Sequence, residues 1–312
     1  MTDHALRKLR ENPRLAELAA FPFDFDVDRA ALGHVEPVRL ASGGPLTVVA
    51  GDDTGGTYFV CADGGVLHAD SEGGACLIGT SVDEALEVVI GLADWGAFAD
   101  LTPRDGEERI LARKAEVEEE IREHYGIDDE RRELLAGLGL PERSPVELVG
   151  MLHRALTRTE PDHVLLNAEE LNAYRFLHDH DELPPLWEYL GLAPDASADP
   201  AAQPLTTWTR PVLVQGRTEA VRVALIRRLD ALVMNQSLLR RPEAPGRLDT
   251  APLRELAEEF EHLGDLPQAL RAQRLYAALQ DSPRERAAAD ATVVRLEERV
   301  RAAPQVPVVS GA

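Results

Sequence analysis

The spacing of hydrophobic positions divides the chain into a helical start, a β-rich stretch and a long helical remainder. Leucines recur at helical spacing within residues 1–21, and Pro13 is expected to break this stretch or to begin a second helix. Between residues 35 and 79 the hydrophobic runs are short and separated by glycine-rich turns, as in an antiparallel meander. The predicted strands are 35–40, 46–50, 57–62, 66–69 and 75–78.

A helix is predicted after the last strand, because Ser81 can cap its first turn and Glu84 follows three residues later. Strands followed by a covering helix form an α+β layer. From residue 106 onward the pattern is helical, and the run 212–214 is the one strand-like exception. Ser144 and Glu147 mark another helix start.

We therefore predict an α+β fold, with an N-terminal antiparallel meander and helices followed by an all-helical C-terminal region. The expected domains are residues 1–100 and 101–303. Two segments rich in Pro and small or polar residues, 194–204 and 241–252, are expected to be linkers, and 304–312 a disordered tail. The aromatic connection 21–26 is expected either to pack over the core or to present an anchor to a partner.

Composition and charge narrow the range of functions. The chain has 312 residues, of which 44% are hydrophobic, so it can bury a core. There are 55 Asp and Glu against 33 Lys and Arg, a net charge of −22. This balance argues against nucleic-acid binding and against anionic membranes, and it favours a basic partner. Neither a signal peptide nor a transmembrane segment is predicted, and Cys61 and Cys76 are expected to be reduced and buried in a cytoplasmic protein.

The acidic excess is concentrated in one part of the chain. Residues 41–100 contain ten acids and no Lys or Arg. Turns favour Asp and helix starts favour Asp and Glu, which is a simpler explanation for many of these residues. The absence of cations is less well explained, so we predict that an exposed subset binds a basic protein surface. The predicted partner-binding residues are Asp52, Asp53, Asp63, Asp70, Glu72, Asp83 and Glu87.

The stretch 46–92 resembles the SUKH superfamily, which contains fungal cell-wall-assembly regulators and bacterial immunity proteins of polymorphic toxin systems. The matching features are a strand at 46–50, a glycine-rich turn at 51–56, an aromatic strand at 58–60 ending near Asp63, a strand at 65–70 and a capped helix start at 80–86. The family's usual opening, a helix and a Leu-Pro-x-x-Tyr segment, is not visible here, and Asp53 replaces the first inner glycine of the turn. The resemblance implies a non-enzymatic domain that binds partner proteins, often toxins.

A weaker resemblance, to a tetratricopeptide-type helical hairpin, covers residues 253–279. Small and aromatic residues lie at the spacings that such hairpins use for close packing, and the pair at 264–265 would form the turn. Gln273 and Tyr276 depart from the pattern. A single repeat cannot bury its face alone.

The segment His178–Asp181 carries the strongest catalytic pattern, because its two imidazoles and two carboxylates could bind a divalent metal. A helix end followed by a polar turn explains the same residues more simply. His153 and His163 have no evident ligand partner in the sequence. The turn 51–56 lacks a Gly-Lys-Ser/Thr and is not a phosphate-binding loop.

These patterns predict a non-enzymatic, cytoplasmic protein-binding protein that needs no cofactor or metal. Its expected role is that of an immunity-type neutraliser of a toxin, or of a regulatory adaptor, acting through an acidic surface. One alternative is a helical-repeat-like scaffold that binds peptides through the C-terminal region. The other is a metal-dependent enzyme centred on the His178–Asp181 loop.

Overall fold

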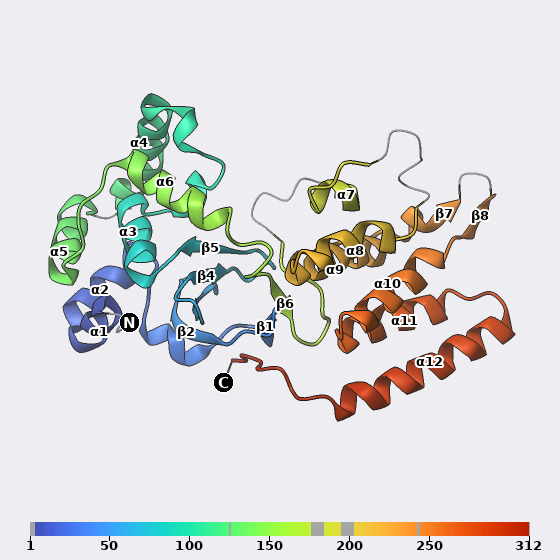
Figure 1. Cartoon of the computed structure of the whole chain (residues 1–312). Helices are drawn as coiled ribbons and strands as arrows, with labels where there is room; N and C mark the ends of the chain where they lie inside the picture. The colour runs from blue at the N-terminus through green and yellow to red at the C-terminus, as the bar shows by residue number, and fades with distance from the viewer. Residues whose placement is uncertain (1–3, 125, 176–183, 195–202, 242–243, 312) are drawn as a thin grey trace. The chain divides into compact units, whose positions relative to one another are not determined.

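The computed structural model describes residues 4–124, 126–175, 184–194, 203–241 and 244–311 (Figure 1). The chain forms two compact units, and each is described by itself. Unit 1 comprises the described parts of Met1–Ala168, Tyr174–Asp179 and Pro307–Ala312, and unit 2 those of Glu169–Ala173 and His180–Val306. The boundary between the units thus differs from the one expected near residue 100.

Unit 1 is built on the predicted antiparallel meander. Its strands are β2 (Leu46–Gly51), β3 (Thr57–Cys61), β4 (Val66–Ala69) and β5 (Ala75–Gly79), hydrogen-bonded in sequence order. Phe59 of β3 lies opposite Val48 of β2 and Leu67 of β4. Glycine-containing turns join neighbouring strands, and Asp63 stabilises the β3–β4 turn by accepting a hydrogen bond from the Gly65 amide at 3.1 Å.

The sheet is buried on both faces, so its strands are nearly continuously hydrophobic. Successive side chains alternate between the faces. Phe59, Cys61 and Leu77 pack in one hydrophobic cluster, whereas Tyr58, Cys76 and Ile78 pack in another. The two cysteines therefore lie on opposite faces of the sheet, and both are free thiols.

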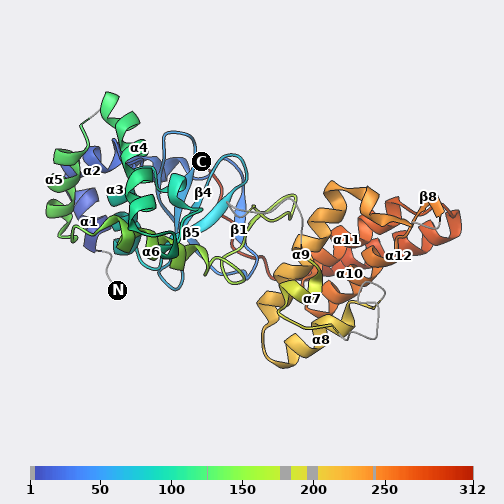
Figure 2. The same ribbon diagram turned by 90° about the horizontal axis from the view of Figure 1, so that it is seen from above.

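Helices cover the face that carries Tyr58, while the β1 strand lies on the other side of the sheet (Figure 1 and Figure 2). The helices of unit 1 are α1 (His4–Glu11), α2 (Pro13–Ala20), α3 (Val82–Leu92), α4 (Glu107–His124), α5 (Asp128–Leu138) and α6 (Pro145–Leu156), with 3-10 turns η1 (Asp28–Leu32), η2 (Trp95–Phe98) and η3 (Pro103–Asp105). Leu134, Leu148 and Leu152 belong to the same core as α3. Because α4–α6 complete this core, they are part of the N-terminal domain and not of a separate helical one.

The helix starts follow their predicted chemistry. Pro13 begins α2, and the Asn12 side chain accepts hydrogen bonds from the amides of Arg14 and Leu15. Ser81 caps α3 by accepting from the Glu84 amide at 3.2 Å. Ser144 and Glu147 form a reciprocal capping box at the start of α6. Each cap satisfies amides that have no partner within the helix.

The second face of the sheet is covered by a two-stranded sheet that the sequence pattern did not predict. It joins β1 (Val38–Leu40) to β6 (Leu165–Asn167) in antiparallel register. The predicted strand 35–40 is thus not part of the meander, and a strand is present after residue 106. Val309 extends this pairing, since its amide and carbonyl both bond to Val38, at 2.9 and 2.8 Å. The segment expected to be a disordered tail therefore forms a β-bridge in unit 1.

Unit 2 is helical, as predicted for the C-terminal region. Its elements are α7 (Leu186–Tyr189), α8 (Thr206–Val214), α9 (Thr218–Met234), η5 (Gln236–Leu239), the short strands β7 (Arg240–Arg241) and β8 (Ala244–Leu248), α10 (Ala251–His262), α11 (Leu266–Ala278) and α12 (Pro283–Ala302). The run 212–214 is the end of a helix and not a strand. The expected turn at 264–265 joins α10 to α11, with Gly264 at a φ of +75° and Asp265 capping α11.

None of the helices in the described ranges is both long enough and apolar enough to cross a membrane.

Candidate functional site

The predicted acidic residues do not form one surface. Asp52 and Glu87 are only 7% and 5% exposed, so they are not part of an open binding face. Glu87 is instead ion-paired to Arg143. Asp53, Glu72 and Asp83 are exposed, whereas Asp70 caps a turn by accepting from the amides of Glu72 and Gly74. Asp63 is paired with His163 and Arg158.

Asp52 forms a buried pair with His68 of β4. The imidazole Nε2 donates to Asp52 Oδ2 at 2.8 Å, and Asp52 Oδ1 accepts from Thr54 N, Thr54 Oγ1 and Gly56 N at 2.9, 2.8 and 2.7 Å. Burial by itself would raise the pKa of Asp52. The hydrogen bonds from His68 and Thr54 outweigh it and hold that pKa well below its usual range. Asp52 is therefore held in its ionised form by these hydrogen bonds.

Gly56 is required for this pair because the space beside it is already filled. A Cβ at this position would overlap Asp52 Oδ2 and would lie 2.7 Å from His68 Nε2. Gly56, at the end of the turn, thus leaves free the space in which the Asp52 carboxylate and the His68 imidazole approach each other.

The pair lies in a cavity of about 620 Å³ between the β2–β3 turn and the connection after α3. Aromatic rings flank His68: Tyr58 at a centroid distance of 4.7 Å and Trp95 at 5.2 Å in an edge-on arrangement. Further lining residues are Phe21, Pro22, Phe23, Asp24, Asp53, Thr54, Ala93, Asp94, Gly96, Val117 and Ile121. Among the residues that the structure describes, the lining thus includes four carboxylates but no lysine or arginine.

The carboxylates of this acidic aromatic cavity repel one another. Burial, together with the charges of Asp53, Asp52 and Asp94, raises the pKa of Asp24 to about 6, and Arg29 opposes this only weakly. Asp24 also has a φ of +52°, a left-handed conformation that a few non-glycine residues adopt. A cation that entered the cavity would lower the energy of all four carboxylates and could stack against Trp95 or Tyr58.

The aromatic connection 21–26 packs into the core, as one of its two expected roles requires, and leaves one of its rings exposed. Phe23 and Phe25 are almost completely buried in the core, whereas Phe21 is 50% exposed at the cavity. A bridge between Asp26 and Gly51 holds this connection against the end of β2. The position of Asp24 in the cavity therefore follows from the burial of its two phenylalanine neighbours.

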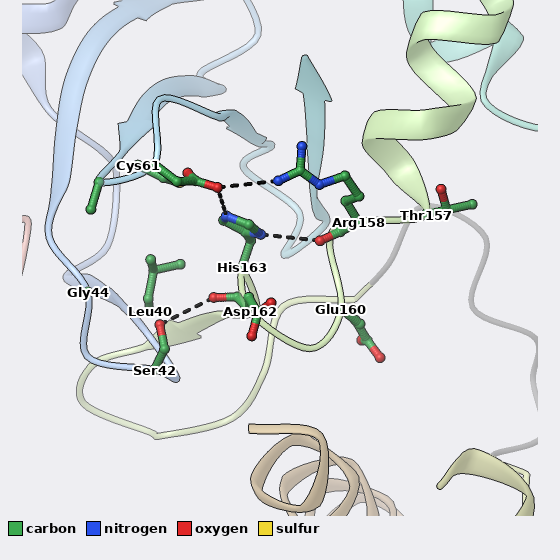
Figure 3. Close-up of a pocket in the computed structure, with 11 residues that line it drawn as sticks. Leu40, Ser42, Gly44, Cys61, Thr157, Arg158, Glu160, Asp162 and His163 are labelled. Atoms are coloured by element: carbon green, nitrogen blue, oxygen red, sulfur yellow. Dashed lines mark hydrogen bonds and ion pairs between the residues drawn. The ribbon is translucent and has the colours of Figure 1, made fainter. Parts of the chain in front are cut away.

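A second cavity, of about 470 Å³, lies on the opposite side of the sheet (Figure 3). It is lined by the β3–β4 turn and by the segment that follows α6. His163 projects between them and is buried. Its Nε2 lies 3.1 Å from Asp63 Oδ2, and its Nδ1 lies 3.2 Å from the Arg158 carbonyl. Arg158 also approaches Asp63, at 3.5 Å.

Cys61 joins Asp63 and His163 at this second cavity. One ligand atom from each of the three residues lies within 4.8 Å of the others, the one group of this kind found in the described ranges. Burial raises the pKa of the Cys61 thiol to about 12, and the nearby Asp63 adds to the shift. Cys76 is fully enclosed on the opposite face, where burial again raises the pKa of its thiol above the ordinary value.

Several residues of both cavities could not be foreseen from the sequence. Ala93, which has a positive φ, ends α3 and turns the chain over the sheet. Asp94 and Trp95 follow it directly. The sequence offered no ligand partner for His163, which contacts Asp63 across a separation of 100 residues. The available sequence signal for the first cavity was the placement of acidic residues directly beside aromatic ones at positions 24 and 94–95.

The other predicted chemical segment, His178–Asp181, lies outside the described residues.

Comparison of the chain with protein-family models, with curated proteins and with solved structures finds no match in any of the three.

Proposed function

We propose that this protein is a non-enzymatic, cytoplasmic protein-binding protein that neutralises or regulates a basic partner by taking an arginine side chain into the acidic aromatic cavity. A toxin-like partner, as the SUKH resemblance implies, is the class we favour. The observation that carries the proposal is the cavity's lining, whose described residues supply four carboxylates and several aromatic rings and no lysine or arginine.

Charge explains why a cationic group would be bound there. Burial, and then the charges of the neighbouring carboxylates, raise the pKa of Asp24, and a positive group in the cavity would offset the repulsion among these charges. Electrostatic attraction also increases the rate at which a basic partner reaches the site.

The residues that line the cavity favour arginine over lysine. A guanidinium is planar, can bond to two carboxylate oxygens at once and stacks on aromatic faces. Asp53 and Asp94 are exposed at the cavity, while Trp95 forms part of its wall. A partner arginine would thus find both carboxylates and a flat ring within one cavity.

The order of elements between β2 and α3 gives additional support. A strand, a glycine-rich turn, an aromatic strand, a hairpin strand and a capped helix occur in the order that the SUKH resemblance implies. The proposed surface is smaller than the sequence predicted, because Asp63 and Glu87 are paired with cations outside this cavity. The helical scaffold remains an alternative, and no specific binding feature favours it in the described residues of unit 2.

A short arginine peptide is the first probe of this proposal. Wild-type protein is titrated with the peptide at low and high salt, and tryptophan fluorescence is followed because Trp95 lies in the wall. We expect the double variant Asp53→Asn/Asp94→Asn to bind at least about tenfold more weakly, about 1.4 kcal/mol. The matched control is Glu72→Gln/Asp83→Asn, which removes two exposed charges outside the lining.

Two results would contradict the proposal. Equal affinity for the double variant and its control would mean that only the overall negative charge attracts the peptide. Equal affinity for arginine and glutamate peptides would exclude charge recognition altogether. If the peptide binds as expected, capture from a native lysate with wild-type protein and with the double variant then identifies the partner as the protein lost from the variant.

A further inference from the structure

The cluster of Cys61, Asp63 and His163 combines three ligand types from two distant segments. Cys61 ends β3 and Asp63 lies in the following turn, while His163 lies a hundred residues further along the chain. Their ligand atoms all lie within 4.8 Å of one another. Thiolate, imidazole and carboxylate are the three side-chain ligands that zinc uses in proteins.

The second observation is the orientation of the His163 ring. A carbonyl oxygen can only accept, so the contact of Nδ1 with the Arg158 carbonyl places a proton on Nδ1. The other ring nitrogen, Nε2, points at Asp63 Oδ2 from a distance of 3.1 Å, on the side where the Cys61 thiol also lies. A histidine that donates one ring N–H to a backbone carbonyl and aims the other nitrogen at anionic ligands is the usual arrangement at a metal.

We propose that Cys61, Asp63 and His163 bind one Zn²⁺ ion through Sγ, a carboxylate oxygen and Nε2, with the fourth position open to water from the second cavity. This combination of thiolate, carboxylate and imidazole favours zinc over calcium and magnesium. Calcium and magnesium require oxygen ligands and do not use thiolates. Three protein ligands beside a cavity of about 470 Å³ leave room for an exchangeable fourth ligand.

Binding requires proton loss and one local rearrangement. The Zn–S bond forms as the Cys61 S–H bond breaks and its proton passes to solvent. Arg158 contacts Asp63 Oδ2 at 3.5 Å, but its side chain is 53% exposed and can turn into solvent when the ion neutralises Asp63. Asp63 Oδ1 keeps its hydrogen bond from the Gly65 amide, so the β3–β4 turn need not change.

The ion would connect two parts of unit 1. It would join the β3–β4 turn to the segment between α6 and β6, and thereby the meander to the sheet that covers it. A ligand that binds only the folded state stabilises it, so zinc is expected to raise the Tm of the full chain. This role is independent of the acidic aromatic cavity, because Tyr58 and Cys61 belong to the cores on opposite faces of the sheet.

Cobalt provides a direct test, because Co²⁺ replaces zinc and absorbs in the near ultraviolet when a thiolate binds it. The full chain is first dialysed against a chelator and then titrated with Co²⁺ and with Zn²⁺. We expect one ion per chain, a thiolate-to-cobalt absorption band and its loss in Cys61→Ala. Cys76→Ala is the matched control and should keep the band, since Cys76 lies on the opposite face.

Two further ligand variants have controls of the same chemistry. His163→Gln and Asp63→Asn should each weaken zinc binding at least about tenfold, the lower limit for loss of even an outer partner. His153→Gln and Asp70→Asn should leave it unchanged, and Asp70 occupies a similar turn position in the next hairpin. Circular dichroism verifies that each variant is folded, and Cys61→Ser replaces Cys61→Ala if the latter is not.

The proposal is overturned if neither metal binds, or if cobalt binds without the thiolate band. It is equally overturned if the band survives in folded Cys61→Ala or Cys61→Ser.

Discussion

The charge of Asp24 serves the proposed function, and the same charge lowers the stability of the folded protein. Its side chain is half-buried beside three other carboxylates, and its backbone has a positive φ. The neighbouring phenylalanines determine its position because they are buried in the core. A carboxylate that is held in this way destabilises the free protein at neutral pH and is relieved by a bound cation.

The raised pKa of Asp24 predicts a specific pH dependence of folding. The folded state holds the proton more tightly than the unfolded state, whose ordinary value is 3.8. The stability contribution of Asp24 is therefore fully present below about pH 4 and is lost as pH rises through about 6. We expect Asp24→Asn to be more stable than wild type at about pH 8, by about 1–2 kcal/mol after solvent screening.

Urea unfolding at several pH values measures this difference. Asparagine is suitable because it keeps the side-chain shape and tolerates the positive φ. Asp83→Asn, on the exposed first turn of α3, is the control. A stability difference for Asp24→Asn that stays constant from acid to alkaline pH would show that Asp24 titrates as an ordinary carboxylate.

At the scale of elements, α4 is a charged and largely solvated helix, and one buried ionic residue, Glu118, joins it to the core. Glu118 is only 3% exposed and is ion-paired with Lys114, Arg122 and Arg131. Arg131 of α5 also donates to the Ile90 carbonyl of α3 at 3.0 Å. Three helices thus meet at one carboxylate.

Removal of Glu118 should leave these cations without their buried partner. Because an uncompensated buried charge is costly, we predict that Glu118→Ala lowers the free energy of unfolding by about 3 kcal/mol. The exposed Glu116→Ala on the same helix should change it by less than about 0.5 kcal/mol. Chemical denaturation compares the two, and similar values would mean that α4 does not depend on the ionic contact.

At the scale of the whole molecule, the chain returns to unit 1 after forming unit 2. Val309 makes two backbone hydrogen bonds to Val38, and the approach of Gly311 to the segment at Gly33 and His34 is very close. A Cβ on Gly311 would lie 2.8 Å from the His34 carbonyl oxygen, so a larger residue cannot be accommodated without a shift. The C-terminal segment is therefore an integral part of the N-terminal unit.

Truncation after Val306 should consequently destabilise unit 1. The loss of two backbone hydrogen bonds predicts a decrease of about 1–3 kcal/mol, and the amide of Val38 should exchange faster with solvent. Hydrogen exchange of the full and truncated chains tests this directly. The exposed substitution Val308→Ser provides a control for side-chain effects, and unchanged exchange at Val38 after truncation would contradict the prediction.

The sequence by itself determined the local elements and the class of fold. Glycine turns and short hydrophobic runs between residues 46 and 79, and caps at Ser81 and Ser144, are short-range signals, and these formed the expected strands and helices. The net charge and the absence of cations between residues 41 and 100 also came directly from the sequence. Such features could be predicted because their physical causes act over a few residues.

Only the tertiary structure decided which of these residues come together. β1 lies within a predicted strand, but its partner β6 is only three residues long, and the two pair across more than a hundred residues. Packing of α4–α6 on α3 moved the domain boundary, and burial removed Asp52 and Glu87 from the predicted surface. His163 reaches Asp63, and Asp24 reaches Asp52, through long-range packing, because the pattern along a chain specifies which residues are buried but not which distant residue they contact.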